Sequence, residues 1–197
     1  MTAKACFGET LLARRECMFD RHTEALGTLR QFDAVSDEDL SAPDVAEQSL
    51  FCARGLPGAE NLDIEALCSR LDEWAELIDG ATCRMLPKFQ ARPQEFENSE
   101  AYFRMLVMVT VLQRNLGVRY NPERMAGSLD CRDSRDLFIH GCLGEHGGTC
   151  ASMPVLYLAI GRRLGYPLLL VGAKQHLFVR WEESGGEDNK GVGRLCS

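Results

Sequence analysis

The hydrophobic positions in roughly the first 125 residues recur at helical spacing. The clearest segment is residues 61–80, NLDIEALCSRLDEWAELIDG, in which most apolar side chains fall on one face of a 3.6-residue period. Asn61 or Asp63 is suited to cap the start of this segment, and Gly80 is suited to close its end. The pattern therefore predicts an amphipathic helix over residues 61–80.

Two further segments before the middle of the chain also predict helices. Residues 99–117, SEAYFRMLVMVTVLQRNLG, are apolar on nearly all sides, which predicts a buried helix that ends at Gly117. Residues 44–53 form a weaker amphipathic segment, followed by a turn at residues 55–58. Residues 1–35 fit a helix only loosely.

The pattern changes after the turn at Asn121-Pro122. Residues 150–165, CASMPVLYLAIGRRLG, predict a buried helix whose basic residues stand in the last turn, as the helix dipole favours. The runs YPLLLVG, residues 166–172, and HLFVRWEE, residues 176–183, are short, apolar and bounded by Gly or Pro, so they predict two strands. The last fourteen residues, 184–197, have the composition of a loop or tail. Helices followed by strands favour an α+β fold.

Composition narrows the class of protein. The chain has 45% apolar and 26% charged residues, as ordinary globular proteins do. A net charge of −7 argues against nucleic acid as the main partner, and no apolar run reaches the ~18 residues of a membrane span. We identify no signal peptide at the N-terminus and expect a cytoplasmic protein without a membrane partner. The nine cysteines are then expected to stay reduced, most of them as small buried hydrophobic residues.

The stretch GGTCASMP, residues 147–154, carries the candidate chemistry. Cys150 follows a Gly-Gly loop and opens the predicted buried helix, whose free N–H groups could stabilise both a thiolate and an oxyanion. Gly148 would let a substrate approach the backbone closely, and Thr149 is suited to cap the helix. A buried, inert thiol is the alternative interpretation of Cys150.

A histidine opens the second predicted strand. Because side chains alternate along a strand, His176 shares a face with Phe178 and Arg180, away from the more apolar set. His176 can face the start of the preceding helix if that helix packs across the sheet. A satisfied histidine at a strand end is the alternative.

Residues 106–182 resemble the transglutaminase-like superfamily, and within it uncharacterised bacterial proteins with a helical N-terminal part. The resemblance rests on LQRNLGVRYNP, on DLFIHGCL, and on GGTCASMPVLYLAIGRRLGYPLLLVGAKQHLFVRW, where GTC at a helix start precedes H-x-F-x-R-W by 26 residues. It implies a papain-like core, with Cys150 as the nucleophile and His176 as its base.

The resemblance also implies an acidic residue or Asn on the next strand, to orient the histidine. The chain has EDNKGVG at residues 187–193, which lacks the apolar alternation of a strand, so Asp188 and Asn189 are the nearby candidates and Asp188 is taken as the third catalytic residue. We therefore interpret the C-terminal strands as incomplete and the core as shortened at its C-terminus. His146 and Gln175 join Gly148 and Thr149 as candidate substrate-binding residues.

Two other functions stay open. His140, Cys142, His146 and Cys150 have zinc-ligand side chains, but they lack a C-x-x-C knuckle, and such a site would occupy the thiol. We expect no metal and no other cofactor. A non-catalytic interaction module that retains the fold is the other alternative.

These observations combine into one prediction. Residues 1–125 form a helical region packed on a papain-like, transglutaminase-like core at residues 126–197 with a small antiparallel sheet. The predicted function is thiol-dependent acyl transfer or amide hydrolysis on a peptide or protein amide, with low activity because the third catalytic residue is poorly placed. The acyl acceptor and the oligomeric state are left open.

Overall fold

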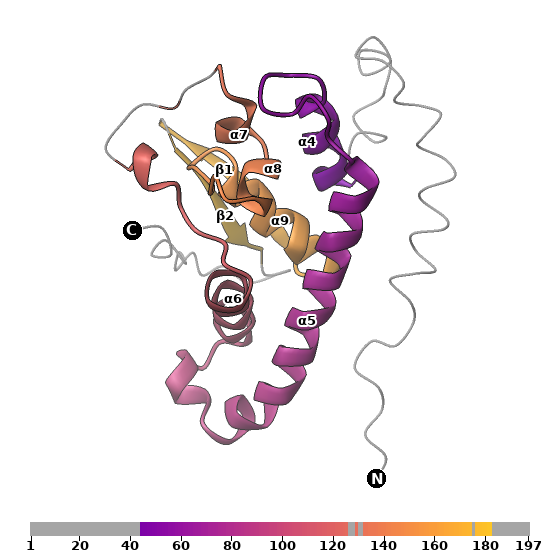
Figure 1. The fold of residues 1–197 in the computed structure, drawn as a ribbon. Helices are drawn as coiled ribbons and strands as arrows, with labels where there is room; N and C mark the ends of the chain where they lie inside the picture. The colour runs from indigo at the N-terminus through magenta and orange to yellow at the C-terminus, as the bar shows by residue number, and fades with distance from the viewer. Residues whose placement is uncertain (1–43, 126–128, 130–131, 175, 183–197) are drawn as a thin grey trace, which may run out of the picture. The chain divides into compact units, whose positions relative to one another are not determined.

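The computed structural model describes residues 44–125, 129, 132–174 and 176–182. From Val45 on, these residues belong to one compact unit, with mixed helix and sheet (Figure 1). The predicted helices at 1–35 and the residues after 182 lie outside the described part. The elements are α4 Val45–Ala53, α5 Ile64–Ala91, the 3-10 turn η1 Pro93–Phe96, α6 Glu100–Thr110, the π-helical turn η2 Val111–Asn115, the 3-10 turn η3 Pro122–Arg124, α7 Ser134–Leu137, α8 His140–Leu143, α9 Met153–Arg163, β1 Leu168–Ala173 and β2 His176–Trp181.

The main hydrophobic cluster joins the predicted N-terminal helices to α9. Leu50 of α4, Leu71 and Ile78 of α5, and Leu156 and Ile160 of α9 are all fully buried in it. A largely buried ion pair also joins α5 to α9, since Arg163 Nε lies 2.8 Å from Asp72 Oδ1. Helices on both sides of residue 125 therefore contribute to one core. The predicted boundary at that residue stays a prediction.

Helix α5 is longer than its sequence pattern predicts. Asp63 caps its start, with the carboxylate accepting from the N–H of Ala66 at 3.0 Å. The expected stop at Gly80 is wrong, because the helix continues through Gly80 and Pro87 to Ala91. A second cluster holds the extension in place. Its aromatic side chains are Phe89, Phe96 and Phe103, and the rings of Phe89 and Phe103 stack with centroids 4.8 Å apart. Tertiary packing here outweighs the low helix propensity of Gly and Pro.

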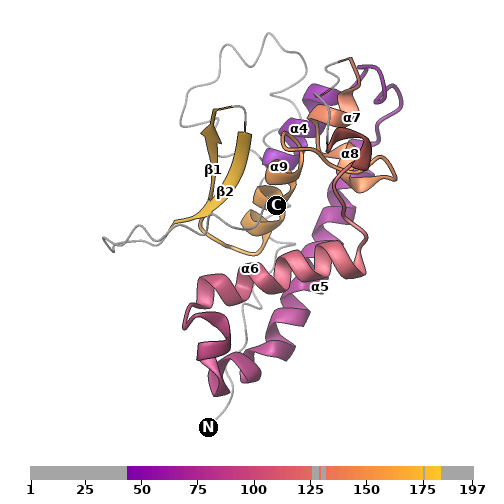
Figure 2. The same ribbon diagram turned by 90° about the vertical axis from the view of Figure 1, so that its left-hand side faces the viewer.

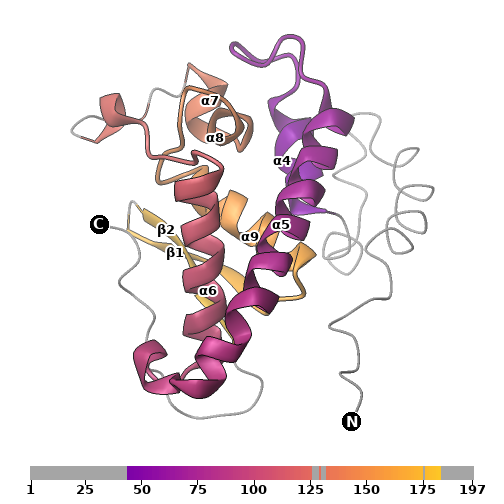
Figure 3. The same cartoon turned by 60° about the horizontal axis from the view of Figure 1, so that its bottom comes forward.

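The other predicted elements are confirmed. Residues 45–53 form α4, and residues 100–115 form α6 and its π-helical continuation, which ends before Gly117 with φ of +74°. Figure 3 shows α5 and α6 joined through the turn between them, with α9 visible between the two helices. None of the helices among the described residues has the length and apolarity to cross a membrane.

The sheet is an antiparallel hairpin of β1 and β2, in which Leu168 pairs with Trp181 and Ala173 with His176. Leu168, Val179 and Trp181 pack against the main cluster, so one face of the hairpin covers the core. The chain leaves α9 and returns along it in β1. The turn of the hairpin therefore stands at the end where α9 begins (Figures 1 and 2). The α+β class is confirmed for the described residues.

Candidate functional site

The Gly-Gly loop before Cys150 is fixed by a short parallel bridge. Gly148 pairs with Tyr120: its N–H donates to the Arg119 carbonyl at 2.8 Å, and its carbonyl accepts from the N–H of Asn121 at 2.7 Å. Gly147 has φ of +86°, which favours glycine. A Cβ on Gly148 would collide with the side chain of Met153 and stand 2.7 Å from the Cys142 sulfur. Close packing therefore requires glycine at position 148.

Thr149 caps the turn that carries Cys150, although α9 itself begins only at Met153, with Ser152 and not the predicted Thr149 at its N-cap position. The Thr149 hydroxyl accepts from the N–H of Ala151 at 3.1 Å and donates to the Asp136 carbonyl at 2.5 Å. The Thr149 carbonyl accepts from the N–H of Met153 at 3.0 Å, so residues 150–152 form one helical turn that leads into α9. Thr149 is fully buried, whereas Cys150 is half-buried. The thiol thus stands at the amino end of α9 and is accessible in part.

Beneath this loop lies a buried charge that was not predicted as a site residue. The Asp136 side chain is 0% exposed. Its Oδ2 lies 2.6 Å from Arg124 Nε, a contact that is ionic rather than a well-aligned hydrogen bond. Its Oδ1 lies 2.7 Å from His146 Nε2. The Asp136 carboxylate therefore links η3 to His146, which precedes the Gly-Gly loop. The backbone carbonyl of Asp136 accepts from Thr149, which follows that loop.

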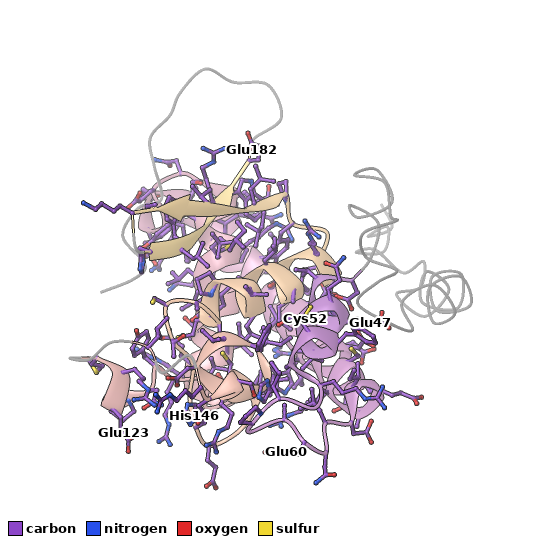
Figure 4. All side chains as sticks on the ribbon, turned by 90° about the horizontal axis from the view of Figure 1, so that it is seen from above. Glu47, Cys52, Glu60, Glu123, His146 and Glu182 are labelled. Atoms are coloured by element: carbon purple, nitrogen blue, oxygen red, sulfur yellow. The ribbon has the colours of Figure 1, made fainter. Side chains whose placement is uncertain are left out.

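The bond to Asp136 decides the tautomer of His146. An ionised carboxylate only accepts, so Nε2 of His146 carries a proton. The same Nε2 lies 3.2 Å from Nδ2 of Asn121, which is also a donor, so the carboxylate and not the amide is the partner of the ring. Nδ1 is then the ring nitrogen that a neutral His146 keeps unprotonated. Figure 4 shows His146 at the same side of the molecule as Glu123 and far from Glu182, which follows β2.

Tyr120 is a second neighbour of Cys150 that the sequence did not reveal. Burial raises the pKa of its hydroxyl, and the charge of a neighbouring Cys150 thiolate adds to the rise in pKa, whereas the backbone N–H of Cys150 opposes it. The Asp136 carboxylate is a further cause that raises the pKa of Tyr120. The Tyr120 hydroxyl therefore lies beside both the thiol and the backbone N–H of Cys150.

The second predicted catalytic residue, His176, is the first residue of β2 and is exposed. The hairpin turn brings it to the end of α9 where Cys150 lies (Figure 2). Alternation along β2 places His176 on the face opposite to Val179 and Trp181, which pack on the core. Within the described part of the chain, no hydrogen bond joins its ring to the thiol of Cys150. The two residues share one end of the fold, but the structure does not bring them into contact.

Several predicted site residues lie outside the described residues. These are Gln175, a candidate for substrate binding, and Asp188 and Asn189, the candidates for the third catalytic residue. The proposed incompleteness of the C-terminal strands falls in the same region. All of these stay predictions.

The four candidate zinc ligands occupy separate places. His140 Nε2 lies 3.2 Å from the Ser134 hydroxyl, and His146 is held by Asp136. Cys142 is buried, and burial raises the pKa of its thiol to about 11. Across residues 44–125, 129, 132–174 and 176–182, no three His, Cys, Asp or Glu side chains form a group that could hold a metal ion. The described residues therefore give the zinc hypothesis no geometric support.

The sequence marks Asp136 only as a carboxylate that could shift nearby pKa values, and it does not single out Tyr120, because the partners of both residues are distant along the chain. Asp136 lies ten residues before His146, in the mixed segment RDSRDLFIHGCL. Nothing in its local pattern marks it as buried. The sequence gives one weak indication for Tyr120: it immediately precedes the Asn121-Pro122 turn. In the structure Tyr120 forms a β-bridge with Gly148.

Comparison with known proteins adds relatives that share part of this sequence. The chain is 25% identical over 174 residues to F-box only protein 21 of Pongo abelii, which covers 86% of this chain and 27% of that protein. The chain is 22% identical to F-box only protein 21 of Homo sapiens over the same length of 174 residues. It is 34% identical to F-box only protein 21 of Mus musculus over 65 residues. The chain therefore spans about a quarter of the length of the two relatives it matches over 174 residues. No solved structure matches the chain.

A family model described as the transglutaminase-like superfamily matches residues 67–191, which is more than half of the 197 residues. The match begins within α5 and includes α6, α9, the hairpin and the loop with Cys150. The match supports the resemblance to this superfamily that the sequence motifs indicate. The relatives found are eukaryotic, whereas the motifs resemble uncharacterised bacterial members. The chain belongs to the transglutaminase-like superfamily.

Proposed function

We propose that the protein is a cysteine-dependent acyltransferase or amide hydrolase, with Cys150 as its nucleophile. One observation carries the proposal: the thiol is half-buried on a capped turn at the amino end of α9. The positive end of a helix stabilises a thiolate, and N–H groups at that end stabilise an oxyanion. The family supports cysteine chemistry in general.

In this mechanism the Cys150 thiolate attacks the carbonyl carbon of a peptide or protein amide. The carbonyl electrons collapse back, the C–N bond breaks, and the leaving amine takes a proton from a protonated imidazole. A thioester remains on Cys150. Water or a second amine then attacks the thioester and gives a proton to the imidazole, and the C–S bond breaks to release the Cys150 thiolate beside the protonated imidazole. We assign the imidazole to His176.

The assignment of the base rests on the topology of the hairpin. The exposed His176 ring has no hydrogen bond in the described part of the chain, but β2 directs it away from the core, so the proposal requires the end of the hairpin to shift when a substrate binds. Catalytic hydrogen bonds are often formed only in the substrate complex. His146, fixed by Asp136 at 2.7 Å, is proposed as a substrate contact beside the Gly-Gly loop. Gly148 and Thr149 are buried and their polar groups are bonded within the protein, so the predicted substrate contacts at these two residues are not part of the proposal. Asp188 and Gln175 keep their proposed roles as the orienting and substrate-binding residues.

The test is brief alkylation by iodoacetamide below about pH 7, mapped by mass spectrometry. Cys150 is expected to react before the other cysteines. Cys83 is the matched control, since it is also half-exposed. His176→Asn should slow the labelling of Cys150 but not of Cys83. Equal labelling of Cys150 and Cys83 would contradict the assignment of the nucleophile.

Activity separates the enzyme from a non-catalytic interaction module. A panel of peptide, ester and amine probes is compared between the parent chain and Cys150→Ala. A turnover that disappears in Cys150→Ala, with unchanged far-UV circular dichroism, supports the enzyme. A selectively reactive Cys150 without turnover on any probe would favour the interaction module.

A further inference from the structure

A surface depression lies next to the loop that leads to Cys150, but neither Cys150 nor His176 lines it. Its volume is about 700 Å³, within the range of ligand sites in proteins. Its walls come from α5, the segment after η2, and the end of α8 with the residues that follow it. The lining residues are Arg70, Trp74, Leu116, Gly117, Arg119, Cys142, Leu143, Gly144 and Glu145.

Two guanidinium groups are held in place at this depression by the same loop. Arg70 Nη1 donates to the Leu143 carbonyl at 2.8 Å, and its guanidinium lies 5.0 Å above the ring of Trp74. Arg119 Nη2 donates to the Glu145 carbonyl at 2.9 Å. Each group uses one N–H in this way. Within the part of the chain that the structure describes, the other N–H donors of both groups have no protein partner.

The depression also has an apolar wall. Trp74 is 5% exposed and Leu143 is 4% exposed, and both belong to the main hydrophobic cluster. A ligand that fits must therefore present oxygen acceptors to the two guanidinium groups, and the small apolar surface that Trp74 and Leu143 leave open accepts only a short carbon skeleton. Guanidinium groups fixed in advance lose little freedom on binding a carboxylate, which they match in geometry.

We propose that this depression binds a small organic acid, with Arg70 and Arg119 as the carboxylate ligands. Glu145 contributes the one negative side chain of the lining, so the depression keeps an excess of positive charge in a protein of net charge −7. The inference does not rest on the proposed function, because the thiol of Cys150 takes no part in it.

The test uses succinate as the probe and the full chain as the protein. Trp74 and Trp181 are the two tryptophans of the chain, so Trp181→Phe leaves Trp74 as a single fluorescent reporter in the wall of the site. We expect saturable binding of one succinate per chain, measured by Trp74 fluorescence and by isothermal titration calorimetry in low-chloride buffer.

Four substitutions test the residues. Arg70→Gln and Arg119→Gln should each weaken succinate binding by about tenfold or more, since each removes charged hydrogen-bond donors. Glu145→Gln should strengthen binding, because it removes the negative charge from the lining. Arg119 keeps its position in this variant, since it is held by the backbone carbonyl of residue 145 and not by the carboxylate. Arg70→Lys keeps the positive charge but lacks the paired N–H donors of a guanidinium group, so it should also weaken binding. It provides a second variant if Arg70→Gln fails to fold.

Arg162→Gln is the matched control, because Arg162 is an exposed arginine of α9 that does not line the depression. It should bind succinate as the parent chain does. The absence of saturable binding, equal weakening by Arg162→Gln, or binding of inorganic phosphate but not of succinate would each overturn the proposal.

Discussion

The buried carboxylate of Asp136 offers the most direct test of how the Cys150 loop is stabilised. The Asp136 side chain is 0% exposed, and its partners Arg124 and His146 are 22% and 16% exposed. Removing one partner of a buried ion pair costs about 3–5 kcal/mol, because a charge is left buried without compensation. Since Arg124 keeps some access to water, we expect the cost here to lie toward the lower end of that range.

Two substitutions separate charge from hydrogen bonding at this position. Asp136→Asn keeps an oxygen that can accept from His146 but leaves Arg124 without its counter-charge, so we expect a loss of about 2 kcal/mol in the free energy of unfolding. Asp136→Ala removes both interactions and should cost about 3 kcal/mol. Glu100→Gln is the control, since this carboxylate is 57% exposed in an (i, i+4) pair, worth about 0.5 kcal/mol.

The assay is urea unfolding at neutral pH, followed by far-UV circular dichroism, with the slope of the free energy against urea compared among the variants. An unchanged slope assigns the difference to stability. A loss below about 1 kcal/mol for Asp136→Ala would refute the reasoning, because it would show that the carboxylate contributes no more than an exposed ion pair does.

Three other outcomes follow from the same contacts. Gly148→Ala should destabilise the chain by about 1–3 kcal/mol in urea unfolding, because the new Cβ collides with Met153 and Cys142; the absence of any loss would mean that the loop relaxes freely. Cys142, whose pKa burial raises to about 11, should resist iodoacetamide near pH 8 until the chain unfolds, and labelling in the folded state would contradict its burial. The hydrogen bond from Arg135 lowers the pKa of Asp133 to about 2 from 3.8, so its stabilisation is complete above the unfolded pKa and is lost as pH falls toward 2. Asp133→Asn should remove this pH-dependent part of the free energy of unfolding, which is about 1 kcal/mol after allowance for solvent screening. The measurement compares urea midpoints of the two proteins at about pH 6 and about pH 3. A pH dependence that is the same in both would contradict the prediction.

The local patterns were sufficient for α4, α9 and the hairpin, because each is an apolar segment with clear boundaries in the sequence, although Leu169 and Leu170 of β1 stay exposed. They failed at the end of α5. The residues that hold the helix beyond Gly80 belong to the cluster with Phe96 and Phe103, whose contribution depends on the turn η1. The end of an amphipathic helix is set by its tertiary partners, and a pattern restricted to residues 61–80 does not contain them.

The candidate site divides in the same way. The Gly-Gly loop and the apolar helix behind it were sufficient to single out Cys150 and the capping role of Thr149. The sequence does not predict the network below them. Tyr120 reaches the loop through its bridge to Gly148, and Arg124 pairs with Asp136, so each contact joins segments that are distant in sequence. The pairing of Cys150 with His176 depends on the orientation of one exposed side chain at a strand end, which alternation alone does not determine.

Helix α5 takes part in two separate hydrophobic clusters, and this has a consequence for how the protein opens. Its amino-terminal part holds Leu71 and Ile78 in the main cluster, whereas its carboxyl-terminal end holds Phe89 against Phe103. The aromatic cluster has no buried member in common with the main one, so it can separate from its neighbours while the Cys150 loop keeps its packing. Native-state hydrogen exchange should then show the amides near Phe89 opening at a lower free energy than those near Leu71, with α5 fraying from its carboxyl end before the protein unfolds globally.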